Sequence, residues 1–114
     1  MNKVQLVGRT TRNIGVVSVN GNVYAKFTVA INEGKDKDGN ERATFVPVTA
    51  WGKVAEGLAK YVGKGSLVGV EGRIYVNYSE EKMFMRVAAT RVEYLATKKP
   101  VTEMPKISDE DIQF

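Results

Sequence analysis

The feature that most constrains the fold is the spacing of the apolar residues, which alternate along most of the chain and take helical spacing only once. Alternation is clearest in residues 23–31, where these apolar side chains share one side: Val23, Phe27, Val29 and Ile31. It recurs in residues 44–51, 67–76 and 83–95, and an opening stretch runs from about residue 3 to 19. Because successive side chains on a strand point to opposite faces, these segments are predicted to be β-strands.

One segment has a different period. In residues 53–62 the apolar residues recur at helical spacing, and Gly63 follows as a helix stop. Turn signals separate the strands, among them Asn20-Gly21, Asp38-Gly39 and the polar segment 79–82. The resulting order is three strands, one helix and two strands. This order predicts an all-β fold, a five-stranded OB-fold barrel over residues 1–96 with its helix between the third and fourth strands. Other small barrels share the order, so the pattern alone leaves them open.

The absence of cysteine and histidine argues against enzyme chemistry. Without cysteine the chain has no disulfide, thiol nucleophile or thiolate metal site, and without histidine it lacks the commonest general base and metal ligand. Neighbouring carboxylates at residues 80–81 and 109–111 fit solvated charge better than an acid–base pair. We therefore expect no enzyme, no catalytic residues, no metal and no cofactor.

Charge divides the chain into two parts. Residues 1–99 contain 16 Lys and Arg against 9 Asp and Glu, whereas residues 100–114 contain one Lys against four acidic residues. A basic body suits a polyanion and an acidic end suits a basic protein surface. Residues 97–107 lack periodicity and are expected to be a short linker, followed by an acidic tip at residues 108–114, the two forming a disordered C-terminal tail.

The third predicted strand places large aromatic side chains away from the core. Val46, Val48 and Ala50 form a small aliphatic side, so Phe45, Thr49 and Trp51 fall on the opposite side. Aromatic rings exposed on a sheet stack on nucleic-acid bases without regard to base identity. The alternative is that these rings pack under the helix or in a subunit interface. Tyr24 and Lys26 add a ring and a cation to the outer side of the second strand, and Tyr75 and Tyr78 lie near the end of the fourth.

Several segments resemble the bacterial and phage single-stranded DNA-binding protein family. They are Asn2–Arg9, Phe27–Ala30, Ala50–Glu56 and Tyr61–Arg73, and the last residues are similar to the family's acidic tip, a run of aspartates ending in Ile-Pro-Phe. The resemblance covers about residues 1–96. It implies a homotetramer of OB folds that binds and protects single-stranded DNA (ssDNA) without sequence preference during DNA replication, recombination and repair, with the tip recruiting partner proteins.

The resemblance and the aromatic pattern together give the candidate site residues. Base stacking is expected from Phe45, Trp51, Tyr78 and Tyr24. Contacts to the DNA backbone are expected from Lys3, Arg9, Lys26, Lys53, Lys64 and Arg73, and Arg12 and Arg86 belong to the same interleaved basic set. The partner-binding residues of the tip are Asp109, Glu110, Asp111, Ile112 and Phe114.

Some features depart from the family pattern and keep alternatives open. The loop after the second strand lacks the family's frequent tryptophan, the linker is short, and Gln113 replaces the proline of the tip. These departures favour a phage, plasmid or paralogous form. The competing functions are an RNA-binding OB-fold module and an interaction module whose charge serves solubility. With no apolar leader or membrane-length segment visible, we expect no membrane partner and a cytoplasmic, nucleoid-associated protein, in the host cytoplasm if phage-encoded.

Overall fold

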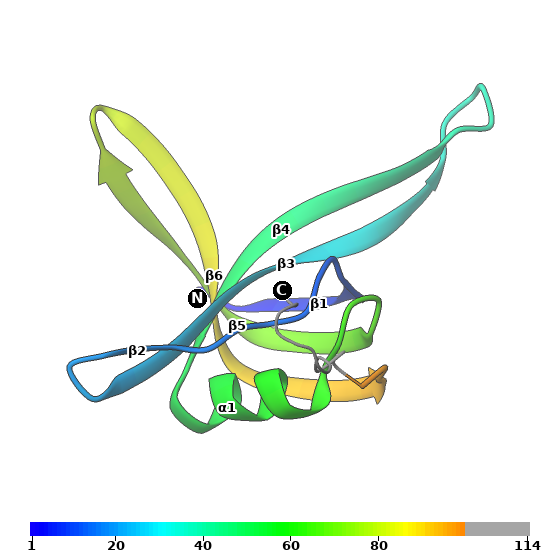
Figure 1. Cartoon of the computed structure of the whole chain (residues 1–114). Helices are drawn as coiled ribbons and strands as arrows, with labels where there is room; N and C mark the ends of the chain where they lie inside the picture. The colour runs from blue at the N-terminus through cyan, green and yellow to red at the C-terminus, as the bar shows by residue number, and fades with distance from the viewer. Residues whose placement is uncertain (100–114) are drawn as a thin grey trace, which may run out of the picture.

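A computed structural model of the chain describes residues 1–99 as a closed β-barrel with one helix (Figure 1). The linker beyond Lys99 and the acidic tip lie outside the described residues. The elements in chain order are β1 (Val4–Thr10), β2 (Val17–Val19), β3 (Asn22–Lys35), β4 (Glu41–Trp51), α1 (Gly52–Tyr61), β5 (Leu67–Ser79) and β6 (Lys82–Ala96).

Five strands form the ring of the barrel, in the order β1-β5-β6-β4-β3, and a pairing between β1 and β3 closes it. The β4–β6 pair is parallel and short, whereas the other pairs are antiparallel. The helix lies between the third and fourth strands of the ring and packs across one end of the barrel (Figure 1). This arrangement confirms the OB-fold prediction.

The core confirms the alternation of the predicted strands. Phe27 and Val29 are buried on one side of β3, and Val48 and Ala50 are buried on one side of β4. The helix contributes its apolar stripe to the same cluster, which comprises Ile14, Ala25, Phe27, Val29, Val48, Ala50, Ala55, Leu58, Val62, Val68, Val70, Val87 and Ala89. The helix ends one residue earlier than predicted, and Val62, immediately beyond it, is fully buried.

The opening stretch was predicted as one strand, and this prediction was wrong. Residues 3–19 form two strands, β1 and β2, joined by a segment in which Ile14 turns its side chain into the core. β2 lies outside the ring and pairs only with β3 in a short hairpin. The break lets β1 cross the barrel to β5 while β2 returns to β3.

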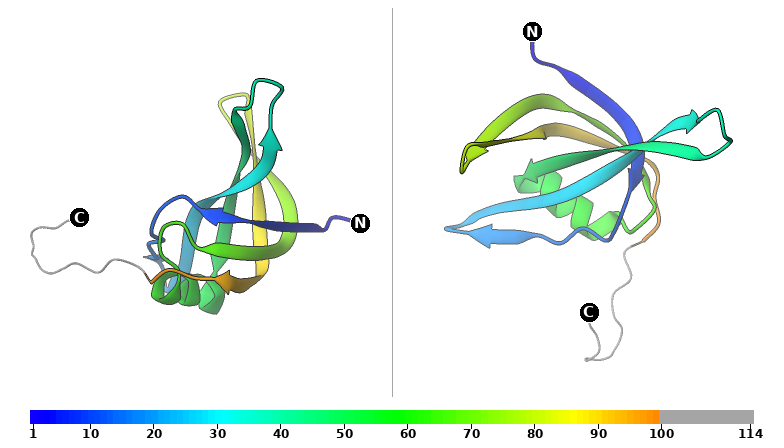
Figure 2. Two further views of the ribbon diagram at one scale, coloured as in Figure 1. Left: turned by 90° about the vertical axis from the view of Figure 1, so that its right-hand side faces the viewer. Right: turned by 90° about the horizontal axis from the view of Figure 1, so that it is seen from above.

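Two hairpins extend beyond the barrel as arms (Figure 2). The β3–β4 hairpin continues to Lys35 and Glu41, and the β5–β6 hairpin continues to Ser79 and Lys82, so these strands are longer than the alternation predicted. Few apolar side chains are buried along an arm, which is why a pattern of core residues does not reveal its length.

The close pairing of β5 and β6 at the register shift depends on Gly72. The pairing of these strands shifts register between Glu71 and Gly72, and Gly72 lies directly against the backbone carbonyl of Ala88. A Cβ at this position would collide with that carbonyl, so only glycine allows the two backbones to approach here. The shift leaves Thr90 of β6 as an extra residue between the pairs that Glu71 and Gly72 form with Arg91 and Ala89, so β6 has a bulge here.

Candidate nucleic-acid interface

Three aromatic rings from three strands meet at the outer surface of the barrel. Tyr24 on β3 is paired with Trp51 on β4, and the ring of Tyr75 on β5 lies 6.3 Å from that of Trp51 at a tilt of 50°. Trp51 is 46% exposed, so the largest ring of the chain is open to solvent. A tilted pair leaves ring faces free for another flat group.

Hydrogen bonds to Thr49 and Val48 fix the Tyr75 ring and Arg86 on this surface. The hydroxyl of Thr49 accepts hydrogen bonds from Arg86 Nε at 2.8 Å and from the Tyr75 hydroxyl at 3.1 Å. Arg86 also donates from Nη2 to the carbonyl oxygen of Val48 at 2.9 Å. We call the side chains of this surface the Trp51 face: Tyr24, Lys26, Thr49, Trp51, Tyr75 and Arg86. Thr49 was predicted on the outer side of β4 and does point there, but it is only 2% exposed because Tyr75 and Arg86 cover it.

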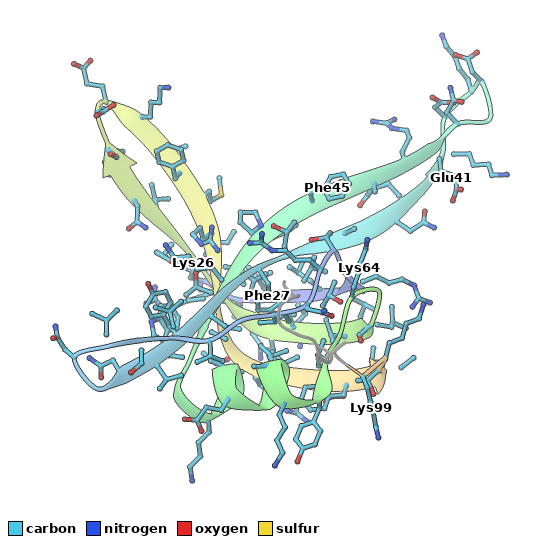
Figure 3. All side chains as sticks on the ribbon, in the orientation of Figure 1. Lys26, Phe27, Glu41, Phe45, Lys64 and Lys99 are labelled. Atoms are coloured by element: carbon cyan, nitrogen blue, oxygen red, sulfur yellow. The ribbon has the colours of Figure 1, made fainter. Side chains whose placement is uncertain are left out.

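Positive charges lie around the rings. Lys26 on β3 (labelled in Figure 3) has its Nζ 6.0 Å from the centroid of the Tyr24 ring. Lys53 begins the exposed side of α1 two residues after Trp51, and Arg73 lies exposed on the same side of β5 as Tyr75. The arrangement combines flat apolar surfaces with cations, which is the combination that binds a polyanion carrying aromatic bases.

Phe45 lies farther along β4, on the same side as Trp51. Six residues separate the two rings, or about 20 Å along an extended strand. Phe45 is 63% exposed and borders an apolar groove of about 320 Å³ between the diverging arms (Figure 3). The groove is lined by Val4, Leu6, Phe45, Val46, Pro47, Ile74, Met85, Arg86 and Val87.

Tyr78 does not join the Trp51 face. It is paired with Met83 and lies on the same side of the β5–β6 arm as Ile74, whereas Tyr75 lies on the opposite side. Its ring is 77% exposed. Base stacking by Tyr78 therefore stays a prediction for a second surface of the arm.

Three of the predicted backbone-binding residues also lie away from the rings. Lys3 Nζ is 3.6 Å from the Glu71 carboxylate on the side of β1 and β5. A hydrogen bond from Gln5, together with the charge of Lys3, lowers the pKa of Glu71 below its usual value. Arg9 Nη1 donates a hydrogen bond to the carbonyl oxygen of Gly65 at 2.9 Å, and the backbone N–H of Lys64 donates to Asn13 Oδ1. Their DNA contacts stay predictions.

The candidate stacking set drawn from the sequence omitted two side chains that the structure places on or beside the Trp51 face. Tyr75 contacts both Thr49 and Trp51, and Phe84 lies on the same side of the β5–β6 arm as Tyr75. Arg73 and Tyr75 are two residues apart on a predicted strand, which already indicated that their side chains lie on the same side of it. The predicted turn at residues 79–82 was the signal for Phe84, because a hairpin turn there sets Phe84 opposite Asn77.

Comparison with known proteins decides the family. The sequence profile described as the Single-strand binding protein family matches residues 1–98. The chain belongs to this family. The single-strand binding resemblance drawn from the sequence is thereby confirmed.

Several single-strand binding relatives are similar over most of the chain. Single-stranded DNA-binding protein 1 of Clostridium acetobutylicum is 40% identical over 107 residues, which cover 87% of this chain and 97% of the relative. Single-stranded DNA-binding protein 3 of the same organism is 38% identical over 94 residues, covering 81% of this chain and 65% of the relative. A single-stranded DNA-binding protein of Streptococcus pneumoniae is 40% identical over 94 residues, covering 81% and 60%.

Residues 1–99 offer neither a metal-binding cluster nor a membrane-spanning helix. That part of the chain contains no group of three or more acidic, histidine or cysteine side chains placed to hold a metal ion. The helix described there is too short and too polar to cross a membrane.

Proposed function

We propose that this protein binds single-stranded DNA without sequence preference by stacking bases on the rings of the Trp51 face. The observation that carries the proposal is the meeting of Tyr24, Trp51 and Tyr75 on one outer surface of the barrel, with Trp51 open to solvent. Every base has a flat π face, so stacking gives affinity without selecting a base. The relatives named single-stranded DNA-binding proteins support the same function.

The phosphate backbone is bound by the cations beside the rings. Lys26, Lys53 and Arg73 are exposed on or beside the Trp51 face, and none of the three forms a salt bridge within residues 1–99. Neutralising phosphates releases condensed counterions, which makes the affinity depend on salt. Phe45, farther along β4, provides a second stacking position on the same side.

A titration with oligo(dT) tests this proposal, because Trp51 is the only tryptophan of the chain. Stacking of a base on its ring quenches the fluorescence, and Trp51→Ala weakens binding by about 1–3 kcal/mol while the domain stays folded. Trp51→Phe keeps a ring and is the matched control. Unquenched fluorescence together with normal binding by Trp51→Ala would show that the ring only packs.

The same titration separates the competing functions. Tighter binding of single-stranded RNA than of ssDNA of equal length would identify an RNA-binding module. Absence of any salt-dependent binding to either nucleic acid would identify an interaction module. Equal quenching by oligo(dT), oligo(dA) and oligo(dC) is the result expected for sequence-independent binding.

The wider role that we propose is protection of ssDNA in replication, recombination and repair by a homotetramer, with residues 108–114 recruiting partner proteins. Three carboxylates beside Ile112 and Phe114 suit a basic rim around an apolar pocket on a partner.

Deletion of residues 108–114 is expected to leave ssDNA affinity unchanged or slightly higher and to abolish binding to purified replication or recombination proteins. Phe114→Ala should cause most of that loss while every charge remains. Light scattering measures the oligomer.

A further inference from the structure

A second pair of exposed rings lies at the opposite end of α1 from Trp51. The rings of Tyr61, the last residue of the helix, and Tyr94 on β6 are 6.2 Å apart at a tilt of 46°. Lys60 Nζ lies 5.3 Å from the centroid of the Tyr61 ring, within range of a cation–π interaction. Tyr61 is 50% exposed, so one face of the pair is open to solvent.

A glycine inside the helix, which lowers its helix propensity, leaves room for this pair. Gly57 lies one turn before Tyr61, and the Tyr94 hydroxyl rests on it so closely that a Cβ would meet the oxygen. Glycine in a helix interior costs about 1 kcal/mol relative to alanine. Burial and the neighbouring Tyr61 raise the pKa of Tyr94, consistent with a hydroxyl held against the helix. The pair is therefore built into the fold.

Hydrogen bonds to the Lys98 backbone hold the segment that carries two more lysines near the end of α1. The carbonyl oxygen of Lys98 accepts hydrogen bonds from the Gly63 N–H and from the Ser66 hydroxyl, and the Lys98 N–H donates to the same hydroxyl at 2.8 Å. These bonds hold the chain after β6 against the turn that follows α1. Lys99 consequently lies next to the C-terminal end of the helix (Figure 3).

The exposed side of α1 connects the two aromatic sites. Trp51 precedes its first residue and Tyr61 is its last, so the sites are about 15 Å apart along the helix axis. Lys53 and Lys60 lie exposed on the helix between them, with Glu56 as the one acidic side chain of that side in the described residues. A chain of phosphates leaving the Trp51 face along α1 would meet positive charge at both ends.

We propose that Tyr61 and Tyr94, with Lys60, Lys98 and Lys99, form a second stacking site for the same ssDNA strand that occupies the Trp51 face; this inference rests on the proposed function. We call these five residues the Tyr61 site. A short oligonucleotide occupies the Trp51 face alone, and a longer one continues along α1 to the Tyr61 site. The occupant is a polyanion with flat bases, because the site offers ring faces and lysines together.

Affinity for oligonucleotides of two lengths tests the proposal in the full chain. Tyr61→Ala should weaken binding of an oligo(dT) of about 16 nucleotides by roughly 5- to 150-fold and leave one of about 4 nucleotides unchanged. Tyr61→Phe keeps the ring and should bind both like the wild type. Ultraviolet cross-linking to iododeoxyuridine-substituted oligo(dT) should place an adduct on Tyr61 with the longer oligonucleotide only.

Each other outcome overturns the inference. Affinity of Tyr61→Ala for the long oligonucleotide within twofold of the wild type, with no adduct, shows that the site does not bind DNA. Equal loss for both lengths with a lower melting temperature shows that the ring supports the fold. Binding of a synthetic peptide of residues 108–114 is measured in parallel. If Tyr61→Ala loses peptide binding but keeps normal binding of both oligonucleotides, the Tyr61 site binds peptide and not DNA. A wild-type chain that binds neither oligonucleotide refutes the proposed function itself, whereas sensitivity to Trp51→Ala alone refutes only the Tyr61 site.

Discussion

Arg86 on β6 donates a hydrogen bond from Nε to the Thr49 hydroxyl on β4 at 2.8 Å, directly beneath the Trp51 face. The two strands pair here in parallel over only two residue pairs, Val48 with Val87 and Thr49 with Ala88. The same hydroxyl accepts from Tyr75. One buried side chain therefore joins the short parallel pairing of β4 and β6 to the aromatic ring that faces Trp51. The β4–β6 contact and the geometry of the binding surface both involve the Thr49 hydroxyl.

Thr49→Val should destabilise the protein by about 1–3 kcal/mol, because it leaves the Arg86 Nε–H and the Tyr75 hydroxyl without their acceptor in a nearly isosteric site. Urea denaturation measures the change. Thr44→Val, an exposed substitution on the same strand, is the control and should stay within about 0.5 kcal/mol. Equal stability of the two variants would show that water replaces the lost hydroxyl.

Tyr75→Ala should weaken oligo(dT) binding by about 1–3 kcal/mol, since it removes a ring that lies 6.3 Å from Trp51. Tyr75→Phe keeps the ring and should retain most of the affinity. Tyr78→Ala tests the other side of the arm. Loss only with Tyr75→Ala would confine ssDNA to the Trp51 face, and equal losses would show that the strand crosses the arm. Unchanged binding by Tyr75→Ala would contradict the proposed stacking surface.

Lys53→Ala and Lys64→Ala should each make the salt dependence of ssDNA binding shallower, by about 0.7 in the slope of log affinity against log salt. Each substitution removes one cation that neutralises a phosphate. Fluorescence titrations at several salt concentrations measure the slope. A slope that neither substitution changes would exclude both lysines as phosphate contacts, even if the affinity itself fell.

Glu81→Gly should stabilise the protein by about 1 kcal/mol. Glu80 and Glu81 form the turn of the β5–β6 arm with φ of 50° and 65°, a left-handed conformation that costs a residue with a Cβ about 1–2 kcal/mol. Thermal unfolding measures the gain. The matched turn of β2 and β3 has Gly21 at φ 80°, so Gly21→Ala should lower stability by a similar amount. A lower melting temperature for Glu81→Gly would show that the glutamate makes contacts that outweigh its strain.

Local periodicity was sufficient to predict which sides of β3 and β4 face the core. Alternation on β3 and β4 placed Phe27 and Val48 inside and Trp51 outside, and the change of period placed the helix, because both are local properties of backbone geometry. The turn at Asn20-Gly21 followed from backbone preference in the same way. The order of these elements predicted the five-stranded barrel, and the family resemblance came from particular segments such as Tyr61–Arg73.

Which outward side chains meet depends on the pairing of distant strands. Tyr75, and not Tyr78, reaches Trp51 because the β5–β6 register and the parallel β4–β6 seam set one side of the arm against β4. The same seam buries Thr49, which alternation assigned to the exposed side. Register and barrel closure join residues far apart in the chain, so they depend on the packing of whole strands and on close approaches such as Gly72 against Ala88. Local periodicity carries no record of those pairings.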